Sequence, residues 1–199
     1  MIDSADVPIH YEVAGDGPPI VLVHGYMGTF ESNWLRTGWV DFLIELERTV
    51  VGLDVRGHGK SGKPHDPAAY ADPHMPDDVM AVMDALGLAR VDLMGYSMGG
   101  SIALKLLARH PARFNSTIVG GAGLRLDPSD PKRIDAIVAA LETSDISAVA
   151  DPVARFMRNF ADSRRSDPQS LADAEPDRYA FAAITRGLAS KHRKTSKPR

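Results

Sequence analysis

The sequence predicts an α/β fold built on a doubly wound, mostly parallel sheet, and three observations lead to this class. Apolar runs that end in glycine or a polar turn alternate with helix-like segments through residue 125. The runs are apolar at successive positions, which is typical of strands buried on both faces of a parallel sheet. The segments between them repeat apolar residues at helical spacing, and this alternation indicates helices packed on both faces of the sheet.

Four runs are predicted as the parallel strands, and an earlier run as an antiparallel neighbour. The earlier run, "IHYEVAG" at 9–15, turns through Asp16-Gly17 into the first of the four. We expect this earlier run to pair antiparallel with the sheet. The four runs are "IVLVHG" at 20–25, "RTVVGLDVRGHG" at 48–59, "RVDLMGYS" at 90–97 and "STIVGGAG" at 116–123.

Helices are expected over residues 32–47, 76–88 and 97–111, each preceding one of the later strands. In 76–88, apolar residues recur at spacings of three and four from Val79 to Leu86. Pro76 suits a first helical turn and Gly87 a helix end. Each helix therefore connects two strands of the predicted sheet.

The alternation stops near residue 125, and the chain is expected to have three parts. Residues 1–125 form the core, residues 126–190 a helical cap segment, and residues 191–199 a basic, disordered tail. The cap shows helical patterns separated by Asp-Pro pairs, with no further strand-like run. The stretch 186–199 has six basic residues and no acidic one, unlike the rest of the chain.

Composition excludes several classes of function. The chain of 199 residues has no cysteine, so disulfides, thiolate nucleophiles and cysteine metal sites are ruled out. A net charge of -3 gives no overall attraction to nucleic acid or anionic membranes, and the basic tail lacks the interleaved aromatic residues of specific nucleic-acid recognition. No signal peptide or membrane span is recognisable. We expect a cytoplasmic protein without metal, cofactor, nucleic-acid partner or membrane partner.

The chemistry is concentrated in "GYSMG" at 95–99, where a predicted strand meets a predicted helix. This is the GxSxG pattern, in which a sharp turn exposes a serine hydroxyl above the sheet. Gly95 and Gly99 allow the turn to close, Ser97 is the candidate nucleophile, and the backbone N–H of Met98 is a candidate oxyanion donor. The alternative is a glycine-rich turn whose serine only caps the helix.

Two more segments make the pattern specific. "VLVHGYMG" at 21–28 and "DVRGHGKSGKP" at 54–64 precede "GYSMGG" in that order. Together they resemble the α/β-hydrolase superfamily in its esterase, perhydrolase and C–C hydrolase branch. The resemblance implies that Ser97 is the nucleophile, that the N–H groups of Tyr26 and Met98 form the oxyanion hole, and that His24 and His58 hold structural positions. Serine rather than aspartate at the elbow argues against epoxide hydrolases and dehalogenases.

The triad of the family runs serine, acid, histidine along the chain, with the last two on loops after later strands. No later strand ending in glycine and aspartate is found here, and no late histidine in an apolar loop. We therefore expect an N-terminal portion of a hydrolase, truncated after the cap region, with an incomplete sheet. Its last strand would be an exposed edge that invites self-association.

No other residue is a convincing acid or base. His110 lies on the helix of Ser97, 13 residues and about 20 Å further on. His192 is surrounded by cations, which oppose the imidazolium that a general base must form. Asp127 is the nearest acid after the fourth strand, but Asp-Pro more simply begins a turn or helix. The remaining histidines, expected to be solvated, are His10, His65 and His74.

The sequence thus predicts a serine hydrolase of a small-molecule ester or acyl substrate, using Ser97, with the acid and the base missing from this chain. Loss of a triad base costs about 10⁶ in turnover, so the chain alone is expected to have little or no activity. One alternative is a catalytically incompetent fragment or pseudoenzyme that acts as a binding module. Another, within enzymes, is a perhydrolase or C–C bond hydrolase.

Overall fold

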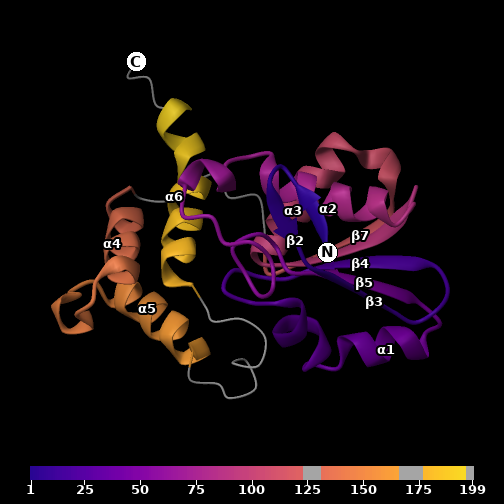
Figure 1. Ribbon diagram of the computed structural model, residues 1–199, viewed down its shortest axis with the longest axis horizontal. Helices are drawn as coiled ribbons and strands as arrows, with labels where there is room; N and C mark the ends of the chain where they lie inside the picture. The colour runs from indigo at the N-terminus through magenta and orange to yellow at the C-terminus, as the bar shows by residue number, and fades with distance from the viewer. Residues whose placement is uncertain (123–130, 166–176, 196–199) are drawn as a thin grey trace. The chain divides into compact units, whose positions relative to one another are not determined.

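The computed structural model describes residues 1–122, 131–165 and 177–195 (Figure 1). The chain divides into two compact units. Unit 1 comprises Met1–Gly62 and Met75–Leu124, and unit 2 comprises Lys63–His74 and Arg125–Arg199. The segment 63–74, which lies within the predicted core by sequence, therefore groups with the C-terminal unit.

Unit 1 contains a five-stranded sheet that matches the predicted class. Its order is β3-β5-β4-β6-β7, with β3 antiparallel to β5 and the other neighbours parallel. The four apolar runs and the earlier antiparallel strand are all confirmed. A separate hairpin joins β1 and β2. The bounds are β1 Ile2–Ser4, β2 Val7–Ile9, β3 Tyr11–Ala14, β4 Pro19–Val23, β5 Thr49–Leu53, β6 Val91–Tyr96 and β7 Phe114–Gly120.

The register of the parallel strands places three loops at one edge of the sheet. Val23 of β4 lies level with Leu53 of β5 and Gly95 of β6. The residues that follow these strands therefore begin side by side. This is the edge at which open α/β sheets bind their ligands.

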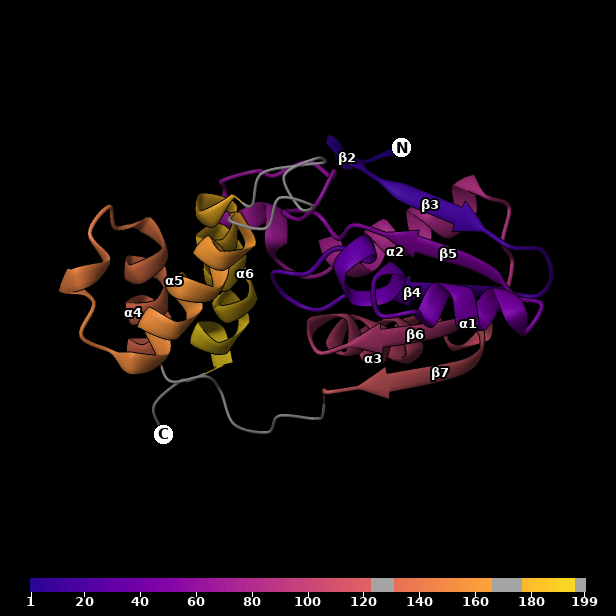
Figure 2. The same ribbon diagram turned by 90° about the horizontal axis from the view of Figure 1, so that it is seen from below.

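Helices cover both faces of the sheet. In Figure 2, α1 (Trp39–Glu45) lies in front of the strands, with α2 (His74–Ala85) and α3 (Met98–Arg109) behind them. The helix expected over 32–47 is divided into a π-helical turn, η1 (Glu31–Leu35), and α1. The division falls at Gly38, whose φ of 80° is incompatible with a continuous right-handed helix.

A cluster of buried apolar residues fills the space between the sheet and the helices η1 and α1. Packing explains why position 52, in the middle of β5, is glycine, because a Cβ there would lie 1.8 Å from the ring of Phe30. The ring lies where a side chain of β5 would otherwise stand. The buried members of the cluster are Ile20, Leu22, Phe30, Trp34, Val40, Leu43 and Val50.

Unit 2 is helical in its described part. The helix α4 (Pro131–Glu142) packs against α5 (Pro152–Arg165) and α6 (Arg178–Thr195), and α6 also contacts the short helix η2 (Pro67–Tyr70). Two further single turns are η3 (Pro111–Arg113) in unit 1 and η4 (Ile146–Ala148) in unit 2. Of the helices described, none is long and apolar enough to cross a membrane.

The helix α6 extends to Thr195 and so includes residues 191–195, which the sequence placed in a disordered tail. Apolar residues in the first half of α6, such as Phe181 and Ile184, are buried and anchor the helix. Asp127 and residues 196–199 lie outside the described residues.

Candidate active site

Ser97 occupies a strained turn between β6 and α3. Its φ of 52° and ψ of -112° are rare for a residue with a side chain, and such conformations cost about 1–3 kcal/mol. The Ser97 N–H donates to the carbonyl of Gly120 at 2.8 Å, which ties the turn to β7. The side chain makes no hydrogen bond that caps α3. The Ser97 hydroxyl therefore does not cap the helix, which was the alternative interpretation of this serine.

The two glycines on either side of Ser97 allow the turn to close. A Cβ at Gly95 would lie 2.3 Å from the carbonyl oxygen of Gly99. A Cβ at Gly99 would lie 2.1 Å from the carbonyl oxygen of Val23. Both contacts are with backbone atoms and cannot be relieved by rotating a side chain, so this turn requires glycine at both positions.

The loop after β4 passes directly beside Ser97. A Cβ at Gly25 would lie 3.3 Å from the Cβ of Ser97. Residues 25–28 form a turn, which we call the oxyanion loop after the role predicted for it, closed by a hydrogen bond of 3.0 Å from the Gly28 N–H to the Gly25 carbonyl. Its second residue is Tyr26, and its third, Met27, has a φ of 59°. The Gly25 N–H donates to Oδ1 of Asn33 at 2.8 Å, which fixes the start of the loop.

Met98 is the first residue of α3 and is buried. The first N–H groups of a helix have no intrahelical acceptor and lie at the positive end of the helix dipole. Tyr26 and Met98, the two predicted oxyanion donors, thus belong to the two chain segments that meet at Gly25 and Ser97.

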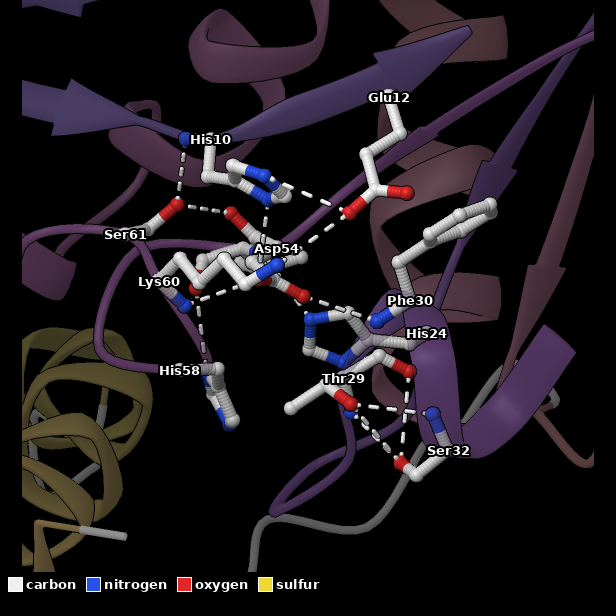
Figure 3. Close-up of polar contacts among 11 residues, drawn as sticks. His10, Glu12, His24, Thr29, Phe30, Ser32, Asp54, His58, Lys60 and Ser61 are labelled. Carbon is white, nitrogen blue, oxygen red and sulfur yellow. Dashed lines mark hydrogen bonds and ion pairs between the residues drawn. The ribbon is translucent and has the colours of Figure 1, made fainter. Parts of the chain in front are cut away.

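Asp54, directly after β5, connects its own loop to the segment after β4 (Figure 3). Its Oδ1 accepts the N–H of Phe30 and its Oδ2 the N–H of Lys60, both at 2.9 Å. Nδ1 of His10 lies 3.3 Å from Oδ2. Burial alone would raise the pKa of Asp54, but His10, His24 and the two N–H donors lower it to about 2. The carboxylate is therefore ionised at neutral pH and acts as a structural anchor.

His24 and His58 each accept a hydrogen bond from a backbone N–H of the other's loop. The Val55 N–H donates to Nε2 of His24 at 2.9 Å, and the Met27 N–H donates to Nε2 of His58 at 3.1 Å. Because an N–H can only donate, both Nε2 atoms must be unprotonated. Nδ1 of His24 then donates to the Gly25 carbonyl at 2.8 Å, and Nδ1 of His58 to the Arg56 carbonyl at 3.1 Å.

This bonding removes both rings from consideration as the general base. A base must offer a free nitrogen lone pair to the serine hydroxyl, and in each ring the Nε2 lone pair already accepts a backbone N–H. Burial and the neighbouring His24 lower the pKa of His58 to about 3. The two rings lie 5.0 Å apart in an edge-to-face arrangement.

The other histidines are distributed over the two units. His10 was expected to be solvated, but its side chain is only 15% exposed and lies between Asp54 and Glu12. The reason is that the antiparallel strand β3 begins beside the end of β5. In unit 2, Nε2 of His65 lies 2.7 Å from Oδ2 of Asp177. His74 begins α2, His110 ends α3, and His192 falls within α6.

Sequence reasoning missed two residues that support the site, Asn33 and His10. His10 acts on the carboxylate of Asp54, which is distant in sequence, and Asn33 on the N–H of Gly25 within the same loop segment, and no sequence motif marks either contact. Asp54 had a recognisable signal, an acidic residue directly after a buried strand. In the part of the chain that the structure describes, no group of three or more histidine, aspartate or glutamate residues could hold a metal ion.

The comparison with known families agrees with this geometry. The model of the alpha/beta hydrolase fold matches residues 18–147, more than half of the chain. The match includes the oxyanion loop, the loop after β5 and the Ser97 turn. The chain belongs to the alpha/beta hydrolase fold family.

The individual relatives carry names that refer to different activities. The chain is 30% identical over 192 residues to the "Putative carbamate hydrolase RutD" of Caulobacter segnis, which covers 91% of this chain and 70% of the relative. The solved bottromycin epimerase BotH is 29% identical, with a TM-score of 0.73 over 93% of this chain and 70% of that one.

A further solved structure is the enol-lactonase of Burkholderia xenovorans LB400, which is 25% identical, with a TM-score of 0.71 over 94% of this chain and 72% of that one. The chain spans 30% and 50% of the length of two other curated relatives that it matches. Proteins that share this fold are therefore named for more than one reaction.

Proposed function

We propose that this chain contains the nucleophile and the oxyanion hole of a serine hydrolase for small carboxylic esters or related acyl compounds. Ser97 is the nucleophile, and the N–H groups of Tyr26 and Met98 are the oxyanion donors. The acid and the histidine of the triad are not among its residues, so the chain alone has little or no activity.

The backbone of Ser97 is the observation on which the proposal depends. A residue with a side chain is held at positive φ, at a cost in stability, although its hydroxyl does not cap the helix. Strain of this kind concentrates at functional sites, where the surrounding structure maintains it. Its place at the carboxyl edge of the sheet, beside Gly25, is where a ligand would meet it.

The chemistry follows the acyl-transfer scheme. The Ser97 oxygen attacks the carbonyl carbon of the substrate while its proton passes to a base, and the carbonyl oxygen becomes an oxyanion held by two N–H groups. Collapse of this intermediate expels the alcohol, which takes up the proton, and leaves an acyl-serine. Water then attacks the acyl-serine and releases the acid.

Two relatives support an acyl carbonyl as the reacting group. The names of the Caulobacter segnis and Burkholderia xenovorans proteins refer to a carbamate and an enol lactone. Both groups contain a carbonyl bonded to a heteroatom, as a simple ester does. Perhydrolysis or C–C cleavage would use the same serine, and no observation on this chain favours either.

The bonding of the histidines supports the proposal that the triad base is missing from this chain. His24 and His58, which follow strands at the site edge, accept backbone N–H groups through Nε2. His10 places its Nδ1 3.3 Å from the carboxylate of Asp54, and His65 is paired with Asp177 in unit 2. The engagement of these four side chains supports the proposal that the base for Ser97 is missing from this chain.

Chemical rescue tests the proposal. The purified chain is incubated with a fluorophosphonate probe, with and without imidazole as an external base, and labelling of Ser97 is followed by mass spectrometry. We expect slow labelling without imidazole, a rise of at least tenfold with it, and no labelling in Ser97→Ala. Ser101→Ala, on the exposed side of α3 one turn further on, is the matched control and should label as the native chain does.

Other results would change the conclusion. Fast labelling without imidazole that disappears in Ser97→Ala would show that a base is present in the chain. An absence of labelling even with imidazole would contradict the nucleophile and leave the binding module as the better account.

A further inference from the structure

Two loops at the site edge hold each other through matching hydrogen bonds. The oxyanion loop follows β4, and residues 54–61, which we call the β5 loop, follow β5. His24 precedes the oxyanion loop and accepts the N–H of Val55 in the β5 loop. His58 of the β5 loop accepts the N–H of Met27 in the oxyanion loop. Each histidine therefore satisfies a backbone donor of the opposite loop.

We propose that this reciprocal pair is a latch that fixes the oxyanion loop, so that His24 and His58 are positioning residues for the reaction of Ser97. The inference rests on the proposed function, because the latch acts through the Tyr26 N–H. Neither histidine touches the reacting atoms in this proposal. Their contribution is to hold Tyr26 at a fixed place relative to Ser97.

The oxyanion loop needs such support because of Met27. A φ of 59° is unfavourable for a residue with a side chain, and the third position of this turn would suit glycine better. Met27 is buried, so its N–H would lack a water partner if His58 did not accept it. The bond to His58 therefore offsets the strain of the turn and prevents it from relaxing.

The latch works only while His58 is neutral, since a protonated Nε2 cannot accept the Met27 N–H. The groups that face the ring are His24 at 5.0 Å and Tyr26 at 6.0 Å between ring centroids, with the Asp54 carboxylate acting through its charge. Burial and His24 favour the neutral ring, whereas Asp54 and the Arg56 carbonyl favour the charged one, and the pKa of His58 is lowered to about 3. The latch is therefore closed throughout the neutral and mildly acidic range.

Two substitutions of His58 separate positioning from simple packing. In His58→Gln, Oε1 can reach the place of Nε2 and accept the Met27 N–H. In His58→Leu the volume is similar, but no acceptor remains. His110→Leu, at the end of α3 and outside the latch, is the matched control.

Three measurements are made on the full chain. Imidazole-assisted labelling of Ser97 reports the oxyanion hole, and amide hydrogen exchange of Met27 reports the latch, with Leu22 of β4 as reference. Nitrogen NMR of the His58 ring reports its tautomer. We expect His58→Leu to lose at least tenfold in labelling and to speed Met27 exchange at least tenfold, with Leu22 unchanged. His58→Gln and His110→Leu should stay within threefold of the native chain.

The outcomes distinguish the latch from the proposed function. If the native chain is not labelled with imidazole, the proposed function fails, and Met27 exchange and the ring tautomer still decide the latch. Native exchange and labelling in His58→Leu would overturn the latch. If that variant does not fold, the native protein decides, because a protonated Nε2 on His58 at pH 7 is incompatible with the latch, and an unprotonated one supports it.

Discussion

At the scale of single residues, Ser97 shows a conflict between local stability and the presentation of a side chain. Its hydroxyl makes no capping bond, and its backbone would suit glycine. Removing the hydroxyl should therefore cost little, whereas removing the Cβ should relieve strain.

We expect Ser97→Gly to raise the free energy of unfolding by about 1 kcal/mol, the balance between relieved strain and the greater flexibility of glycine when unfolded. Ser97→Ala should stay within about 0.5 kcal/mol of the native value because no hydrogen bond of the fold is lost. Urea denaturation measures both. A marked loss of stability in Ser97→Gly would show that the turn is not strained.

The buried groups also predict how stability depends on pH. The pKa of His58 is lowered from 6.5 to about 3 in the folded chain, so the unfolded chain binds more protons between these values. Stability should be full above pH 6.5 and fall as the pH drops towards 3, by up to about 1.4 kcal/mol per pH unit. Asp54, whose pKa is lowered from 3.8 to about 2, adds a further loss below pH 4.

Urea unfolding between pH 7.5 and 4.5 tests the histidine contribution separately, because Asp54 acts at lower pH. In His58→Gln, the free energy of unfolding should depend less steeply on pH, by the contribution of about one bound proton, since glutamine does not titrate. An unchanged slope in the variant would contradict the assignment to His58.

At the scale of elements, a buried ion pair joins the β5 loop to α2. Nε and Nη2 of Arg56 donate to the two carboxylate oxygens of Asp78 at 2.6 and 2.5 Å, and both side chains are at most 1% exposed. Nη2 also donates to the carbonyl of Ser4 at 3.2 Å, which includes β1 in the same contact. Such a pair orients the elements even where its net stabilisation is small.

A double-mutant cycle measures this coupling. Asp78→Leu should lower the free energy of unfolding by about 3–5 kcal/mol, because a buried guanidinium is left without its partner charge. The double variant Arg56→Met with Asp78→Leu should be more stable than Asp78→Leu alone. Additive losses, measured by urea denaturation, would show that the two charges do not depend on each other.

The elements were largely predictable from sequence, and the contacts between them were not. The strands were found because continuous apolar runs suit a sheet buried on both faces, and the Ser97 turn because its residue types and spacing are specific. The break at Gly38 was missed because an isolated glycine also occurs inside helices. His10 was missed because Asp54 becomes its neighbour only when β3 and β5 pair. Asn33 was missed because only the fold of the segment after β4 brings its side chain to the Gly25 N–H.

At the scale of the whole molecule, the sheet of unit 1 ends at β7. In the described sheet, β7 pairs only with β6, and Ile118 on β7 is 50% exposed. An exposed strand edge with apolar side chains is a surface for pairing between chains. The sequence prediction of self-association at this edge remains a prediction.

We expect the chain to self-associate with rising concentration and Ile118→Lys to weaken this association, because lysine on an edge strand opposes pairing. Leu107→Lys is the matched control, since Leu107 is an exposed leucine on α3 in the same unit. Sedimentation velocity at several concentrations measures the distribution. Equal association of both variants would exclude the β7 edge as the contact.

The bonding of His24 and His58 has a consequence for anyone who wishes to engineer activity into this chain. Both residues lie in segments that follow strands at the sheet edge where Ser97 lies, and a designer would be inclined to turn one of them into a catalytic base. Freeing the Nε2 of either ring would leave a buried backbone N–H without its acceptor. A new base must therefore be grafted from elsewhere, and these two histidines are best treated as part of the scaffold that any redesign inherits.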